Sequence, residues 1–164
     1  MQDVLTIAEV VEVVRRLDER RGLGVSARQL RYWDTALSFG AGRVTDRRNA
    51  ARTFRPSDVA IVRLVRRLQR DEVSARAIWA LLLVFGRELR TVCKPGTSRV
   101  LWMAPNGRAS LLTAKDAASK PTRECYPLAD VVQGVTEMVR TLRSGDYAVW
   151  NGAKAVRVRE LVSA

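Results

Sequence analysis

A short segment, residues 26–35, combines side chains that hydrogen-bond to phosphates and to base edges. Four polar residues recur there at i, i+3, i+4 and i+7, a spacing that places them on one face of a helix: Arg28, Arg31, Tyr32 and Thr35. The opposite face carries three apolar residues that can hold the helix on a protein: Leu30, Trp33 and Leu37. A guanidinium suits guanine, and the amide of Gln29 suits adenine. The segment therefore predicts a helix that reads DNA.

The residues that follow are rich in glycine and arginine. Gly40 and Gly42 permit a turn, and a cluster of closely spaced arginines comes next: Arg43, Arg47, Arg48, Arg52 and Arg55. A guanidinium is planar and permanently charged, so it pairs well with backbone phosphates. We interpret residues 43–54 as a small hairpin, or wing, that grips the DNA backbone through Arg43, Arg47, Arg48 and Arg52. The alternative is a solvated, flexible basic loop.

The composition favours a polyanionic partner. The 164 residues include 29 Lys and Arg against 17 Asp and Glu, which gives a net charge of +12 and a pI near 11.1. Such a surface attracts nucleic acid, and the charge is clustered as well as large. The apolar fraction of 47% is sufficient for a packed core. Double-stranded DNA is therefore the expected partner.

The same composition argues against metal, cofactor and enzyme chemistry. Histidine, the commonest general base and metal ligand, is absent. Cys93 and Cys125 stand alone, without a CxxC spacing, so we expect no metal site, no disulfide framework and a reducing compartment. Only Lys115-Asp116 and Glu124-Cys125 suggest reactive pairs, and we expect neither to be catalytic. No cofactor is predicted.

Targeting signals are also missing from the sequence. No apolar run is long enough to span a bilayer as a helix, and the N-terminus lacks a basic region before an apolar stretch. We therefore expect no contact with a membrane and a cytoplasmic, nucleoid-associated protein.

Two capping boxes mark consecutive helices near the N-terminus. Thr6 with Glu9 opens the first, whose apolar stripe follows helical spacing: Ile7, Val10, Val11, Val14 and Leu17. Gly22 and Gly24 end it, and Ser26 with Gln29 opens the DNA-reading helix. Two capped helices joined by a glycine-containing turn indicate a helix-turn-helix.

Two further helices complete the N-terminal half. The third, after Pro56, buries a stripe of Ile61, Leu64, Val65 and Leu68. Its other face carries Arg63, Arg66, Arg67 and Arg70, which we interpret as a solvated face rather than a binding surface. Ser74 caps the fourth helix, which runs to about Val92 and places Trp79 in the core. Lys94-Pro95-Gly96 then marks a domain boundary, which divides the chain into residues 1–94 and 95–164.

The C-terminal part changes to strands. Asn106-Gly107 and Asn151-Gly152 each lie between strand-like runs, which predicts two β-hairpins. Residues 114–126 are interpreted as a polar loop, and a single helix is expected over residues 128–142. The predicted fold is therefore a mainly α winged helix-turn-helix domain followed by a small α+β module of two hairpins and one helix.

Residues 4–85 resemble the MerR-type winged helix-turn-helix family. The matching segments, in chain order, are Thr6-Ile7-Ala8-Glu9-Val10, Gly24-Val25-Ser26, Leu30-Arg31-Tyr32-Trp33-Asp34, Arg52-Thr53-Phe54, and Asp58 followed by the apolar stripe and the helix from Ser74 to Leu82. The resemblance implies a homodimer on a twofold DNA site, with the second helix in the major groove and the wing on the flanking backbone. Carried over by residue, it implies DNA contacts from Ser26, Arg28, Gln29, Arg31, Tyr32 and Arg52.

The chain departs from that family in three places. Ala50-Ala51-Arg52 stands where the family has Gly-Tyr-Arg, the clustered cysteines of metal sensors are missing, and no long dimerisation helix follows the fourth helix. Residues 95–164 are therefore expected to pair the subunits or to bind a protein partner.

The leading interpretation is a sequence-specific transcription regulator. Two alternatives remain open, namely an architectural phage or plasmid factor for excision or partition, and an antitoxin-like autoregulator whose C-terminal module binds a protein.

Overall fold

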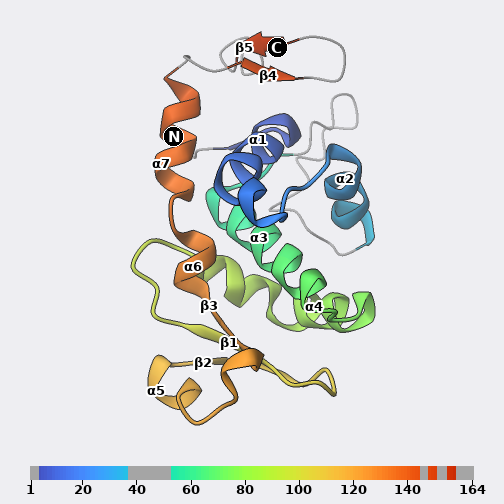
Figure 1. Cartoon of the computed structure of the whole chain (residues 1–164), viewed down its shortest axis with the longest axis vertical. Coiled ribbons are helices and arrows are strands. Elements are labelled where there is room, and N and C mark those ends of the chain that lie inside the picture. Colours follow the sequence, from blue (N-terminus) through green and yellow to red (C-terminus); the bar gives the residue numbers. More distant parts are fainter. Residues whose placement is uncertain (1–3, 37–52, 145–147, 151–154, 158–164) are drawn as a thin grey trace.

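Four helices form the N-terminal half of the computed structural model, which describes residues 4–36, 53–144, 148–150 and 155–157 (Figure 1). In chain order they are α1 (Ile7–Asp18), α2 (Ala27–Ala36), α3 (Pro56–Arg70) and α4 (Ala75–Val92), with a short 3-10 helix, η1 (Glu19–Arg21), after α1. The predicted mainly α, helix-turn-helix character of this half is confirmed.

Both predicted capping boxes are present. Thr6 Oγ1 accepts the Glu9 N–H at 3.3 Å, and the Glu9 carboxylate accepts the Thr6 N–H at 2.7 Å. Ser26 Oγ and Gln29 Oε1 form the same reciprocal pair, at 3.1 and 2.9 Å. Between the two helices, Gly22 adopts φ +68°, a left-handed conformation that suits a residue without Cβ. The caps and this turn fix where α1 ends and where α2 begins.

α3 is the central helix of the molecule. Its apolar side chains are almost fully buried: Val59, Ala60, Ile61, Val62, Leu64, Val65 and Leu68. Pro56 occupies its first position, and the buried Asp58 carboxylate accepts the Arg55 N–H at 2.8 Å and the Arg90 Nε–H at 2.9 Å. This carboxylate therefore closes the start of α3 and ties α4 to it.

The first predicted hairpin is confirmed, and a third strand joins it. β1 (Val100–Met103) pairs antiparallel with β2 (Ala109–Leu112) across the Asn106-Gly107 turn, and β3 (Cys125–Pro127) pairs with the other edge of β1, so the order is β2-β1-β3. The interpretation of residues 114–126 as a polar loop was wrong, since they also contain α5 (Ala114–Ala117) and η2 (Thr122–Glu124). The second hairpin is confirmed as β4 (Ala148–Trp150) and β5 (Ala155–Arg157).

The predicted single helix over residues 128–142 is two helices. α6 (Leu128–Val132) and α7 (Val135–Arg143) are separated at Gly134, which adopts φ +79°. A Cβ at this position would lie 2.9 Å from Leu17 Cδ2, so any other residue here would require the Leu17 side chain of α1 to shift. The glycine therefore allows both the turn and the contact.

One apolar core spans both halves of the chain. α6 and α7 pack against α3, and α7 also packs against α1, so Leu128, Val131, Val139 and Leu142 are buried with the side chains of α3 (Figure 1). The three-stranded sheet lies below α4 in the view of Figure 1. Within the described residues, no helix combines the length and the apolar character needed to cross a membrane.

Candidate nucleic-acid interface

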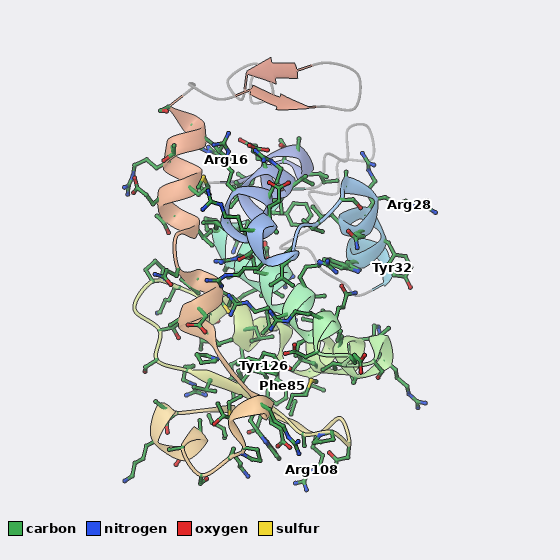
Figure 2. The ribbon with its side chains drawn as sticks, in the orientation of Figure 1. Arg16, Arg28, Tyr32, Phe85, Arg108 and Tyr126 are labelled. Atoms are coloured by element: carbon green, nitrogen blue, oxygen red, sulfur yellow. The ribbon has the colours of Figure 1, made fainter. Side chains whose placement is uncertain are left out.

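α2 has one face in the core and one in solvent. Leu30 and Trp33 are 1% and 3% exposed, whereas Tyr32 is 65% exposed. Arg28 and Arg31 are exposed as well, and Figure 2 shows Arg28 and Tyr32 pointing away from the body of the protein. The predicted division of this helix is confirmed for these five residues. Two guanidinium groups and a phenol are thus presented outward from a single rigid element.

Ser26 and Gln29 belong to the same helix start, and the side-chain oxygen atoms of both residues already accept hydrogen bonds. Each side chain satisfies the backbone N–H of the other residue, which leaves the Gln29 amide NH2 group as its donor toward a ligand. A bidentate contact of Gln29 to adenine therefore needs the second lone pair of its capping oxygen. The cap fixes the side-chain position before any ligand arrives.

The turn before α2 is held by an arginine of α3. Arg66 Nε donates to the Gly24 carbonyl at 2.8 Å, and its Nη1 donates to Gln69 Oε1 at 3.0 Å. This contact connects the turn of the helix-turn-helix to the central helix. Arg66 is therefore a positioning residue for α2, a role that its place in the sequence did not indicate.

The other α3 arginines are engaged too, so their interpretation as a solvated face was wrong. Arg63 is 4% exposed and binds Asp18 in a bidentate pair, with N···O distances of 2.6 and 2.9 Å. Its Nη1 also donates to the carbonyls of Val131 and Gln133, at 2.6 and 2.9 Å. Arg63 thus joins α1, α3 and the break between α6 and α7.

Toward the C-terminal end of α3, the arginine side chains are less buried. Arg67 Nη2 donates to the Asp130 carbonyl at 3.3 Å, and burial beside Arg63 lowers the pKa of Arg67. Arg70, at the end of the helix, is exposed and pairs with Asp71 at 3.0 Å. Of the four α3 arginines, only Arg70 is exposed to solvent as predicted.

The predicted wing falls outside the described residues. Arg43, Arg47, Arg48 and Arg52 all belong to residues 37–52, which the structure does not describe. The described chain resumes at Thr53, and Phe54 forms an antiparallel bridge with Leu5, with N···O distances of 2.6 and 2.8 Å. Because Phe54 is 1% exposed, the C-terminal end of the arginine-rich segment is fixed on the core.

Two of the residues considered for catalysis, Glu124 and Asp116, have structural partners. Glu124 Oε2 accepts the Trp102 indole N–H at 2.9 Å, and Asp116 accepts the Thr113 hydroxyl at 2.8 Å. Burial raises the pKa of the Cys93 thiol to about 12, and burial together with Glu124 raises that of Cys125. Among the residues that the structure describes, no group of three acidic, Cys or His side chains is placed to hold a metal ion.

Trp79 was expected in the core, and that expectation was wrong. It is 45% exposed on α4, next to Leu83 and Val84 at 64% and 71%. The buried side of α4 instead carries Ile78, Leu81 and Leu89.

A capped, outward-facing cationic helix held by a short turn on a preceding capped helix is a helix-turn-helix unit. The model of the MerR HTH family of regulatory proteins matches residues 20–83, which contain α2, α3 and the first half of α4. No curated protein matches the chain. The N-terminal segment is therefore similar to a MerR-type helix-turn-helix, and this similarity suggests a DNA-binding transcription regulator.

Proposed function

We propose that the protein is a sequence-specific DNA-binding transcription regulator whose α2 enters the major groove. The observation that supports this most strongly is the two-sided burial of α2. Leu30 and Trp33 hold the helix rigidly, while Arg28 and Tyr32 extend into solvent from a capped start. A recognition helix needs both properties, since base edges are read by side chains that the scaffold has placed in advance.

Within α2, different residues contact bases and backbone. Arg28 and Gln29 lie in the first turn, where recognition helices contact base edges, and they suit guanine and adenine. Arg31 and Tyr32 lie one turn later and bind phosphates, and Ser26 holds the helix start beside the backbone. These assignments divide the surface into groups that specify the sequence and groups that give sequence-independent affinity.

The arginine-rich segment adds phosphate contacts. We assign Arg43, Arg47, Arg48 and Arg52 to the flanking backbone, because their density of charge suits phosphates better than bases. The bridge between Leu5 and Phe54 supports this role, since it anchors one end of the segment. Two copies of the chain bind one site of twofold symmetry on the nucleoid, as the helix-turn-helix family implies.

Arg28 provides the test of base reading. Binding sites are first selected from random DNA, and affinities for the selected and for random DNA are then measured at a fixed salt concentration. Arg28→Ala should weaken binding to the selected site by roughly 1–3 kcal/mol and affect random DNA less. The matched control is Arg123→Ala, which removes the same charge from an exposed position in η2. Equal losses on both DNAs would contradict a base contact by Arg28.

Arg48 provides the test of the wing. Arg48→Ala should weaken binding to both DNAs alike and reduce the slope of log K against log salt by about one unit, since one fewer counterion is released. The slope is measured by titration at four salt concentrations. A slope equal to that of the unchanged protein would remove Arg48 from the phosphate contacts.

A further inference from the structure

The solvent side of α4 carries a row of exposed apolar side chains. Of the five large hydrophobic side chains that are exposed within the described residues, three belong to this helix, namely Trp79, Leu83 and Val84. The remaining two, Val4 and Tyr32, lie outside α4. Exposed apolar side chains that gather in this way mark an interaction surface. We call the row the α4 stripe, and its members, all exposed, are Arg76, Trp79, Ala80, Leu83, Val84 and Arg87.

The stripe has a shape that suits a second helix. Steps of three and four residues place its members on one side of α4, and Ile78, Leu81 and Leu89 fix the opposite side in the core. Ala80 is the smallest member and lies among the apolar side chains, so another helix can approach most closely there. An amphipathic helix presents its own apolar side chains at the same spacing of three and four residues, so it matches such a row.

The turn between β1 and β2 borders the stripe on one side. A Cβ at Gly107 would lie 3.8 Å from the Cβ of Ala77, which places this turn beside the first turns of α4 (Figure 1). Ala77 is half-buried and lies two turns before Val84 on the same side of the helix. The turn limits the stripe at this edge without covering it, because Val84 remains 71% exposed.

Both ends of the stripe are positively charged. Arg76 and Arg87 are eleven residues apart, which corresponds to about three helical turns or about 16 Å along the axis. Among the described residues, neither guanidinium forms an ion pair. The exposed carboxylates nearest to them in sequence are Glu72, in the turn before α4, and Glu88, which pairs with Arg99 at 3.4 Å. Two cations thus flank an apolar centre and are available to carboxylates of a partner.

A second copy of the stripe does not supply those carboxylates. In an antiparallel pair centred on residues 79–84, Arg76 of each copy would face Arg87 of the other, because both arginines lie three residues beyond that segment. In a parallel pair, each arginine would face its own counterpart. Like charges in such positions are unfavourable, and the net charge of +12 adds repulsion between copies. The charges therefore favour a different, acidic occupant.

We propose that the α4 stripe binds an acidic amphipathic helix of a different protein. The apolar face of that helix packs on Trp79, Leu83 and Val84, and two of its carboxylates, about three turns apart, pair with Arg76 and Arg87. A protein helix fits better than a nucleic acid, because the apolar centre of the stripe offers no cation to a phosphate. The inference goes beyond the proposed function, since it adds a second partner on a surface that the proposed DNA contacts do not use.

A designed peptide tests the binding with the full chain. The probe is a fluorescent helical peptide of about 18 residues, the length of α4, with leucines on one face and two glutamates eleven residues apart. Fluorescence anisotropy measures its affinity. It should bind at least tenfold more tightly than the same peptide with lysines in place of the glutamates, and than a peptide of identical composition whose leucines are scattered around the helix. Equal affinities for the three peptides, or no binding of the first, would overturn the proposal.

A substitution in the stripe locates the bound peptide. Leu83→Glu should weaken binding of the glutamate peptide at least tenfold, because it places a carboxylate in the apolar centre. The matched control is Val4→Glu, which adds the same charge at an exposed apolar residue elsewhere and should leave the affinity unchanged. Circular dichroism and urea unfolding verify that each variant is folded. A folded Leu83→Glu variant with the affinity of the unchanged chain would show that the peptide binds elsewhere.

Charge reversal tests the two ends of the stripe. The double variant Arg76→Glu/Arg87→Glu should reverse the preference, so that the lysine peptide binds more tightly than the glutamate peptide. The control is Lys115→Glu/Arg123→Glu, which changes the net charge equally at exposed positions outside the stripe and should keep the original preference. An identical response of the two double variants would mean that only the net charge attracts the peptide, which would refute the charge match.

Sedimentation equilibrium and DNA titration separate this partner from other occupants of the stripe. Leu83→Glu should leave the mass of the chain in solution unchanged, and it should leave the affinity for the selected DNA site unchanged as well. A dimer that dissociates in this variant would identify the stripe as a contact between copies. A folded variant that loses DNA affinity but keeps the peptide would assign the stripe to DNA. Either result would overturn the proposal.

Discussion

α2 and α3 both carry arginines at helical spacing, and the molecule uses them in opposite ways. On α2, Arg28 and Arg31 are exposed on the side away from the core. On α3, Arg63 is 4% exposed and binds a carboxylate and two carbonyls, while Arg66 holds the turn before α2. The same residue type is thus exposed to solvent on one helix and used to hold elements together on its neighbour.

The difference lies in what packs against each helix. α6 has five residues, so the carbonyls near its C-terminal end lack partners within the helix, and Arg63 supplies the donors for Val131 and Gln133. Asp18, at the end of α1, supplies the countercharge. No described element offers such acceptors around Arg28. An arginine is therefore structural where orphan acceptors face it, and, as at Arg28, available for a ligand where they do not.

The largest effect should come from Arg63→Ala. This change leaves the Asp18 carboxylate buried without its cation and the Val131 and Gln133 carbonyls without the Arg63 donor, so the free energy of unfolding should fall by about 3–5 kcal/mol. Urea unfolding followed by circular dichroism measures it. Arg28→Ala is the companion variant, and its unfolding free energy should stay within about 0.5 kcal/mol of the unchanged protein. Similar losses for both variants would erase the contrast between the two helices.

Arg66→Ala should have an intermediate effect on stability. Arg66 belongs to α3 but holds the turn that precedes α2. The loss of its charged hydrogen bond to the Gly24 carbonyl should cost roughly 1.5–3 kcal/mol of stability. Because this bond positions the turn before α2, affinity for the selected DNA site should fall as well, although Arg66 is not one of the proposed DNA contacts. Measurement at a temperature where the variant is fully folded separates the two effects. An unchanged DNA affinity under those conditions would show that α2 keeps its position without Arg66.

The smallest effect on stability should come from Gln29→Glu. A carboxylate oxygen still accepts the Ser26 N–H, so the capping box is kept and the thermal midpoint should hardly change. The amide NH2 group is lost and a negative charge faces the DNA, so binding to the selected site should weaken at least tenfold. Thermal unfolding tests the first outcome, and titration with the selected DNA site tests the second. If the variant binds DNA with wild-type affinity, Gln29 caps the helix and makes no contact with DNA.

Local signals predicted much of the fold. The Thr6/Glu9 and Ser26/Gln29 boxes located α1 and α2, and Asn106-Gly107 located the first hairpin, because caps and tight turns depend on residues that are close in sequence. Long-range pairing escaped prediction. β3 is a short strand that gains its partner from β1, which lies well before it in the chain, so its own sequence carries little strand signal.

The two faces of a helix were easier to predict than their surroundings. Spacing separated Arg63 and Arg66 correctly from the apolar stripe of α3, but it could not reveal that α6, α7 and the turn before α2 pack on that second face. Trp79 was misplaced for the related reason that spacing does not say which apolar face lacks a covering element. Gly134, inside an otherwise helical pattern, was the available signal for the break between α6 and α7.

The attachment of Arg63 to the break between α6 and α7 limits how this helix-turn-helix unit can be engineered. A fragment cut after residue 94 would keep α1 to α4 but would strip the carbonyl partners from Arg63 and uncover the apolar side chains of α3 that Leu128 and Val131 cover. To transplant the helix-turn-helix onto another protein, a designer would have to include residues 128–143, which cover α3. The alternative is to replace the uncovered apolar residues of α3 with polar ones.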